Sequence, residues 1–110
     1  MEFGTEKIGD VIIVTLHTDV IDSDNTKEFK ADISPVIGEN RHVVFDMEQV
    51  KFVDSSGCGA ILFCLRQLNS KKGDLKVIGV QKAVRTLFEL VRMHRIIDIL
   101  TTKEEAAGSF

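Results

Sequence analysis

The sequence predicts a single α/β domain whose sheet is largely parallel. Short β-branched apolar segments alternate along the chain with segments in which apolar residues recur every three to four positions. Such alternation is typical of strands joined by helices that pack on the sheet. The length of 110 residues fits one domain, and 44% hydrophobic with 28% charged residues is ordinary for a chain that folds on its own. We therefore expect residues 1–110 to form one domain.

The first part of the chain predicts two strands joined by a turn. Residues 1–8 form a weak segment that we expect to be an edge strand, and residues 11–17 (VIIVTLH) are β-branched and apolar. Gly9 and Asp10 lie between the two segments and are typical turn residues.

A helix is predicted next, because four apolar residues follow at helical spacing: Phe29, Ile33, Val36 and Ile37. Asn25 with Glu28 three positions later, or Ser23 with an acidic first turn, would cap its N-terminus. Pro35 is the only proline and falls inside the pattern. Since proline removes a helical hydrogen bond, we expect the helix to kink or end near Ser34.

The rest of the chain continues the alternation of strands and helices. The expected elements are strands at 42–47 and 50–53, a helix at 58–72, a strand at 75–80, a helix at 81–93, a strand at 95–100 and a terminal helical turn at 102–110. We expect the terminal turn to fray, because chain ends are seldom tied down.

Charge and hydropathy argue against several classes of partner. The net charge is −3, and no run of Lys or Arg is longer than Lys71 with Lys72, so we expect no direct binding to nucleic acid or to an anionic membrane. No apolar run approaches the roughly 18 residues of a membrane span, and residues 1–10 are too polar for a signal peptide. These features predict a cytoplasmic protein.

The cysteines do not indicate a disulfide or a metal site. Cys58 and Cys64 are six positions apart on a predicted helix, which separates their Cα atoms by about 9 Å, beyond the reach of a disulfide. We expect free thiols that fill the core. No Cys or His motif has metal-ligand spacing, so neither a metal nor a cofactor is predicted.

The leading candidate site is the segment KFVDSSGCGAILFCLRQL, residues 51–68, where a strand passes directly into a helix. In a parallel sheet, ligands gather beyond the carboxyl ends of the strands. Ser55 would lie at or just before the helix N-terminus, which favours an oxygen or a phosphate. Gly57 and Gly59 would allow another backbone to come close. A purely structural interpretation is also open, in which Ser55 or Ser56 is the N-cap and Asp54 assists it.

The sequence lacks the common catalytic motifs, and no catalytic residue is predicted. Neither serine lies in a GxSxG motif, and no motif ties the three histidines to them. The phosphate-binding motif GxxxxGK followed by Ser or Thr is missing. The acidic residues Asp19, Asp22 and Asp24 precede a predicted helix, where capping explains them better than a metal does.

Two segments resemble the STAS-domain proteins of the anti-sigma factor antagonist type. HVVFDMEQVKFVDSSGCGAILFCL is similar to the family's strand, Asp-Ser-Ser/Thr-Gly-x-Gly loop and following helix, and VQKAVRTLFELVRMHRIIDIL is similar to its closing helix and strand. The resemblance covers nearly the whole chain. It implies a small mixed, mostly parallel sheet with helices packed on one side, and a non-enzymatic binding module.

The resemblance also implies a phosphorylation switch at Ser55. An anti-sigma factor with serine kinase activity would phosphorylate Ser55, and a serine phosphatase would reverse this. The unphosphorylated protein would bind the anti-sigma factor and so release the sigma factor, whereas phosphorylation would abolish binding. The residues implied to contact the kinase are Asp54, Ser55, Ser56, Gly57, Cys58 and Gly59.

One segment departs from the family pattern. Where family members typically carry Gly-x-Leu-Asp after the second strand, this chain has residues 18–21 (TDVI) followed by Asp22, so the acid is displaced by one residue. The resemblance would still add Asp22 to the partner surface. An alternative function is a STAS scaffold subunit, without phosphorylation, in a stressosome-like or lipid/ABC-transport complex. We expect a monomer or a weak dimer.

Overall fold

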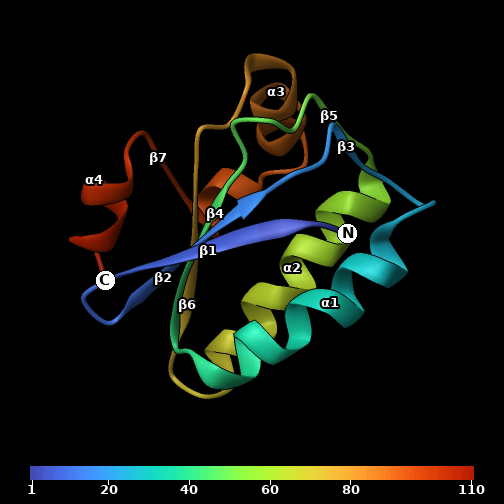
Figure 1. Ribbon diagram of the computed structural model, residues 1–110. Helices are drawn as coiled ribbons and strands as arrows, with labels where there is room; N and C mark the ends of the chain where they lie inside the picture. The colour runs from blue at the N-terminus through green and yellow to red at the C-terminus, as the bar shows by residue number, and fades with distance from the viewer.

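The computed structural model describes residues 1–110 and contains a five-stranded sheet in the order β1-β2-β4-β6-β7 (Figure 1). Strand β1 is antiparallel to β2, and all the other neighbouring strands are parallel. The predicted mixed, mostly parallel sheet is therefore confirmed. Its strands are β1 (Phe3–Ile8), β2 (Val11–Leu16), β4 (His42–Asp46), β6 (Asp74–Ile78) and β7 (Asp98–Leu100).

A second, two-stranded sheet lies beyond the carboxyl ends of β2 and β4. It pairs β3 (Val20–Ile21) in parallel with β5 (Phe52–Val53), with Ile21 opposite Val53. Residues 22–25 join β3 to the next helix, and Asp54 alone joins β5 to the helix that follows it. Because parallel strands end at the same edge, this pairing brings the chain after Ile21 next to the chain after Val53.

The two long helices, α1 (Thr26–Glu39) and α2 (Ser55–Asn69), pack side by side on one face of the large sheet (Figure 1). The main core lies between these helices and the sheet. Its largest fully buried side chains include Phe29, Phe45 and Leu68, and the rings of Phe29 and Phe45 meet edge to face at 5.8 Å. The apolar residues whose spacing predicted the two helices therefore form the helix faces that are buried against the sheet.

The opposite face of the sheet is covered by the short helix α4 (Lys103–Ala107), seen beside the C-terminus in Figure 1. This helix forms within the segment 102–110, for which the sequence predicts a terminal helical turn. Thr102 caps it by accepting a hydrogen bond from the Glu105 backbone N–H at 3.1 Å. Ala106 is fully buried against a small apolar cluster of Val11, Ile13, Val44 and Ile78. The last helix is thus capped and packed.

Helix α1 differs from the prediction at Pro35 and at its N-terminus. The helix continues through Pro35 to Glu39 instead of ending near Ser34. Pro35 is exposed, so water can satisfy the carbonyl that loses its partner, while Ile33 and Ile37 on either side remain buried. Asn25 occupies the N-cap position without a capping hydrogen bond from its side chain.

The closing segment also differs from the prediction. Helix α3 spans Lys82–Leu90 and a 3₁₀ turn, η1, spans Met93–Arg95, whereas the sequence predicted a helix to residue 93 and a strand from 95. Arg92 adopts a left-handed backbone with φ of 62°, which ends the helical path. Met93 and Ile97 are buried around this turn, so they contribute to the core but not to a strand.

None of the helices is long and apolar enough to cross a membrane.

Candidate functional site

The candidate site is the junction between β5 and α2. Asp54 is the N-cap residue of α2, and the helix begins at Ser55, earlier than the apolar pattern predicted. The Asp54 carboxylate accepts hydrogen bonds from the backbone N–H of Gly57 at 2.9 Å and from that of Ser23 at 3.2 Å. Asp54 therefore caps the helix and also fixes the neighbouring loop after β3.

This arrangement corrects the interpretation in which a serine is the cap. Ser55 and Ser56 occupy the first two positions of the helix, and both are exposed. Their backbone N–H groups have no partner within the helix, because the first residues of a helix lack a preceding carbonyl to bind. With Asp54 as the cap, neither serine hydroxyl is needed to start the helix. The site therefore presents exposed hydroxyl groups at the positive end of a helix dipole.

Gly57 is required by the packing of this junction. A Cβ atom at Gly57 would lie 2.3 Å from the carbonyl oxygen of Ile21 and 2.6 Å from Cγ1 of Val53. The first turn of α2 therefore lies directly on the β3 and β5 pair. Gly59 is exposed, and a Cβ atom added there would meet no other atom within 4 Å. Of these two glycines, only Gly57 supports a close backbone approach within the chain.

Both cysteines are free and buried, as predicted. Burial raises the pKa of the Cys58 thiol, and the nearby Asp54 carboxylate raises it further. Burial raises the pKa of Cys64 to about 12. Gly57 and Cys58 are both buried, so neither belongs to the exposed surface of the loop. Of the loop's small and hydroxyl residues, Ser55, Ser56 and Gly59 lie on the surface.

The loop after β3 lies against this junction. Asp22 is partly buried and accepts a hydrogen bond from the Asp24 backbone N–H, while its own N–H donates to Oδ1 of Asn25. The Asn25 side chain also donates to the carbonyl of Val20, which explains why it does not cap α1. The structure thus brings the Asp22 loop and the Asp54 loop together through the bond from Ser23 to Asp54.

An apolar cavity beside Asp54 was not predicted from the sequence. It has a volume of about 270 Å³, lies between β5 and α3, and is lined by Lys51, Phe52, Val53, Asp54, Ala83 and Leu87. Phe52 is 55% exposed, which is unusual for an aromatic residue on a strand. The sequence does contain one usable signal: Phe52 alternates with the buried Val53 and must therefore face the other way.

The fold and this junction define a small α/β protein that carries an exposed serine at a strand-to-helix turn. The STAS domain family matches residues 2–106, and the chain belongs to this family. The resemblance stated from the sequence is thereby confirmed.

Relatives found by sequence point to one group within the family. The chain is 26% identical over its whole length to BtrV of Bordetella bronchiseptica, which carries the name of an anti-sigma factor antagonist, and covers 95% of that protein. It is 31% identical over 65 residues to the anti-sigma F factor antagonist of Paenibacillus polymyxa, covering 59% of this chain and 56% of the relative. The chain is an anti-sigma factor antagonist-like STAS protein, a group of regulators and not of enzymes.

Solved structures share the fold. An anti-sigma factor antagonist from Mycobacterium paratuberculosis matches with a TM-score of 0.86 at 19% identity, covering 98% of this chain and 92% of that one. The Bacillus cell fate determinant SpoIIAA in its phosphorylated form matches with a TM-score of 0.70 at 24% identity, covering 97% of each chain.

Proposed function

We propose that this protein is a phosphorylation-controlled anti-sigma factor antagonist whose switch is Ser55. In the unphosphorylated state it binds an anti-sigma factor that is also a serine kinase, and this binding releases the sigma factor. Phosphorylation of Ser55 ends the binding, and a serine phosphatase restores it. The observation that carries the proposal is the exposed Ser55 hydroxyl at the first position of α2, left free because Asp54 caps the helix.

The helix N-terminus makes Ser55 a suitable place for a phosphate. The phosphoryl group would add about −1.5 to −2 charge next to backbone N–H groups that have no partner in the helix. The adjacent Asp54 carboxylate is also negative and would repel the phosphate, but its two hydrogen bonds from the backbone N–H groups of Gly57 and Ser23 keep it at the helix cap. We therefore expect phosphorylation to leave the fold intact and to act on the partner surface.

The surface around Ser55 suits a protein partner. Ser56 and Gly59 lie on the exposed side of the first turns of α2, and Gly59 has open space around it where a partner backbone can approach. On the other side of Asp54, the exposed Phe52 and the apolar cavity offer a place for an apolar side chain. A new negative charge between these two areas would be desolvated in the complex, which weakens binding.

The test is phosphate mapping. The unaltered protein and its Ser55→Ala and Ser56→Ala variants are incubated with ATP and the anti-sigma factor kinase encoded nearest its gene, and phosphate is located by mass spectrometry. We expect modification of the unaltered protein and of the control variant Ser56→Ala, but none of Ser55→Ala. Phosphate on Ser56, or partner binding that is unchanged by Ser55→Asp, would refute the switch.

A further inference from the structure

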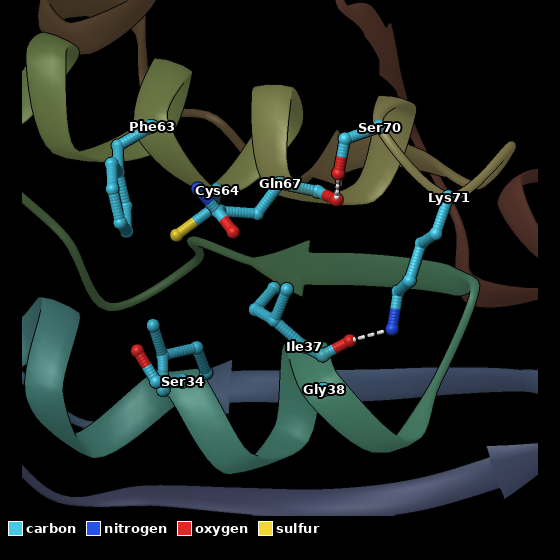
Figure 2. Close-up of a pocket in the computed structure, with 9 residues that line it drawn as sticks. Ser34, Ile37, Gly38, Phe63, Cys64, Gln67, Ser70 and Lys71 are labelled. Atoms are coloured by element: carbon cyan, nitrogen blue, oxygen red, sulfur yellow. Dashed lines mark hydrogen bonds between the residues drawn. The ribbon is translucent and has the colours of Figure 1, made fainter.

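A separate cavity lies between α1 and α2, away from the Ser55 end of α2 (Figure 2). Its volume is about 250 Å³, slightly below the range typical of drug-sized ligands. Its apolar wall comes from both helices: Ile33 and Ile37 from α1, and Phe63 and Cys64 from α2. Its remaining lining residues are Ser34, Gly38, Gln67, Ser70 and Lys71.

The only charged residue that lines this cavity is Lys71, and a second lysine, Lys30, lies beside its Phe63 wall. Figure 2 shows Lys71 reaching across from the end of α2 toward α1, where its ammonium group donates a hydrogen bond to the carbonyl of Ile37. At the opposite side, the Lys30 ammonium lies 5.4 Å from the centre of the Phe63 ring. No acidic residue lines the cavity. Lys71 has three donors, and only one is used by Ile37, so two remain for a bound anion.

The floor of the cavity is apolar at neutral pH. The Cys64 sulfur points into the space between the helices in Figure 2. Burial raises the pKa of this thiol to about 12, so the thiol is neutral and behaves as a small apolar group. An apolar wall that ends at a fixed cation is complementary to a molecule with a hydrocarbon part and one negative group.

We propose that the cavity between α1 and α2 binds a small amphiphilic monoanion of the medium-chain carboxylate class. The hydrocarbon part lies against Ile33, Phe63 and Cys64, and the carboxylate accepts hydrogen bonds from Lys71. This site does not depend on Ser55 or on the proposed switch, because the two places are separated along α2.

Octanoate is the probe for this proposal, and tryptophan fluorescence is the readout. The chain has no tryptophan, so Phe63→Trp puts a single fluorophore in the cavity wall at a position that is 38% exposed. Leu90→Trp puts the same fluorophore at the end of α3, at a position that is 75% exposed and lines neither cavity, and serves as the control. We expect octanoate to shift the Phe63→Trp emission saturably and to leave the Leu90→Trp emission unchanged.

A second pair of variants tests the role of the cation. In the Phe63→Trp background, Lys71→Gln should weaken octanoate binding about tenfold, since a hydrogen bond to a charged group is lost. Lys72→Gln removes the same charge from the neighbouring exposed residue and should have little effect. Octanol should bind more weakly than octanoate. When octanoate is titrated into the unaltered protein, the largest changes in backbone amide chemical shift should occur at Gly38, Cys64 and Lys71.

Three results would overturn the proposal. They are an absence of saturable binding by both fluorescence and NMR, an equal response of the Leu90→Trp control, and equal binding of octanol and octanoate. The NMR measurement uses the unaltered chain, so it decides the question even if a tryptophan variant folds poorly.

Discussion

Adding one methyl group at Gly57 should destabilise the protein, whereas the same change two residues later should not. In Gly57→Ala the new Cβ would lie 2.3 Å from the carbonyl oxygen of Ile21 and 2.6 Å from Val53. The first of these atoms belongs to the backbone, so a change of rotamer cannot relieve the clash. The first turn of α2 must therefore move away from the β3 and β5 pair.

The magnitude follows from two opposing effects. Overpacking a well-packed site costs about 1–3 kcal/mol, and the backbone clash places Gly57→Ala at the upper end. Replacing a helical glycine by alanine stabilises the helix by about 1 kcal/mol, which offsets part of this loss. The expected net loss is about 2 kcal/mol for Gly57→Ala. Gly59→Ala has open space at its Cβ position, so it should gain about 0.5–1 kcal/mol.

Urea unfolding followed by far-ultraviolet circular dichroism measures both changes. The two variants should differ by about 3 kcal/mol in the free energy of unfolding, with Gly57→Ala the less stable. If Gly57→Ala is as stable as the unaltered protein, the close packing of α2 on Ile21 is wrong, and with it the geometry of the proposed site.

Three other predictions follow from the same structure. Asp54→Ala removes the cap of α2 and the bond to the Ser23 N–H, so it should cost about 1–2 kcal/mol in urea unfolding, while a loss near zero would contradict the capping. Burial raises the pKa of Cys64 from 9.0 to about 12. As the pH rises above 9, the thiol loses its proton in the unfolded chain before it does so in the folded protein, so the free energy of unfolding should fall. A Cys64→Ala variant should lose less stability over the same range of pH. Lys76 is buried and its ammonium lies 2.6 Å from Oδ2 of the exposed Asp98. Because methionine keeps the packed apolar stem and loses only the ion pair, Lys76→Met should lower the free energy of unfolding by less than about 1.5 kcal/mol. Lys76→Ala also loses the stem, so it should lower the free energy of unfolding by about 2 kcal/mol. Equal costs for the two Lys76 variants would contradict this account.

The alternation of strands and helices could be predicted from the sequence because apolar residues mark the buried faces. Phe29, Ile33 and Ile37 are spaced for a helix, and all three are buried in α1. The β-branched segment likewise forms β2 (Val11–Leu16), which lies between β1 and β4 in the sheet. Where burial alone decides an element, periodicity is a sufficient guide.

The differences arise where local rules compete with tertiary structure. The sequence rules predict that Pro35 disturbs α1, but its exposed position and its buried neighbours allow the helix to continue. The strand predicted from residue 95 is shortened because Arg92 turns the chain and Met93 enters the core through a 3₁₀ turn. No sequence pattern marks a left-handed arginine.

The candidate site could be located from the sequence, but its internal roles could not. The position of the junction follows from a strand that leads directly into a helix. The roles depend on β3 and the loop after it. The backbone N–H of Ser23 donates a hydrogen bond to the Asp54 carboxylate, and the carbonyl of Ile21 leaves no space for a Cβ atom at Gly57. That loop lies far earlier in the chain, and only the pairing of β3 with β5 brings it into contact.

The most direct test of the proposed function compares how tightly the anti-sigma factor kinase binds the unmodified protein and the protein phosphorylated on Ser55. Our account predicts that the phosphorylated form binds at least about thirtyfold more weakly, because an unpaired charge buried in an interface costs on the order of 2 kcal/mol or more. The circular dichroism spectrum should stay the same. Equal affinity of the two forms would contradict the account.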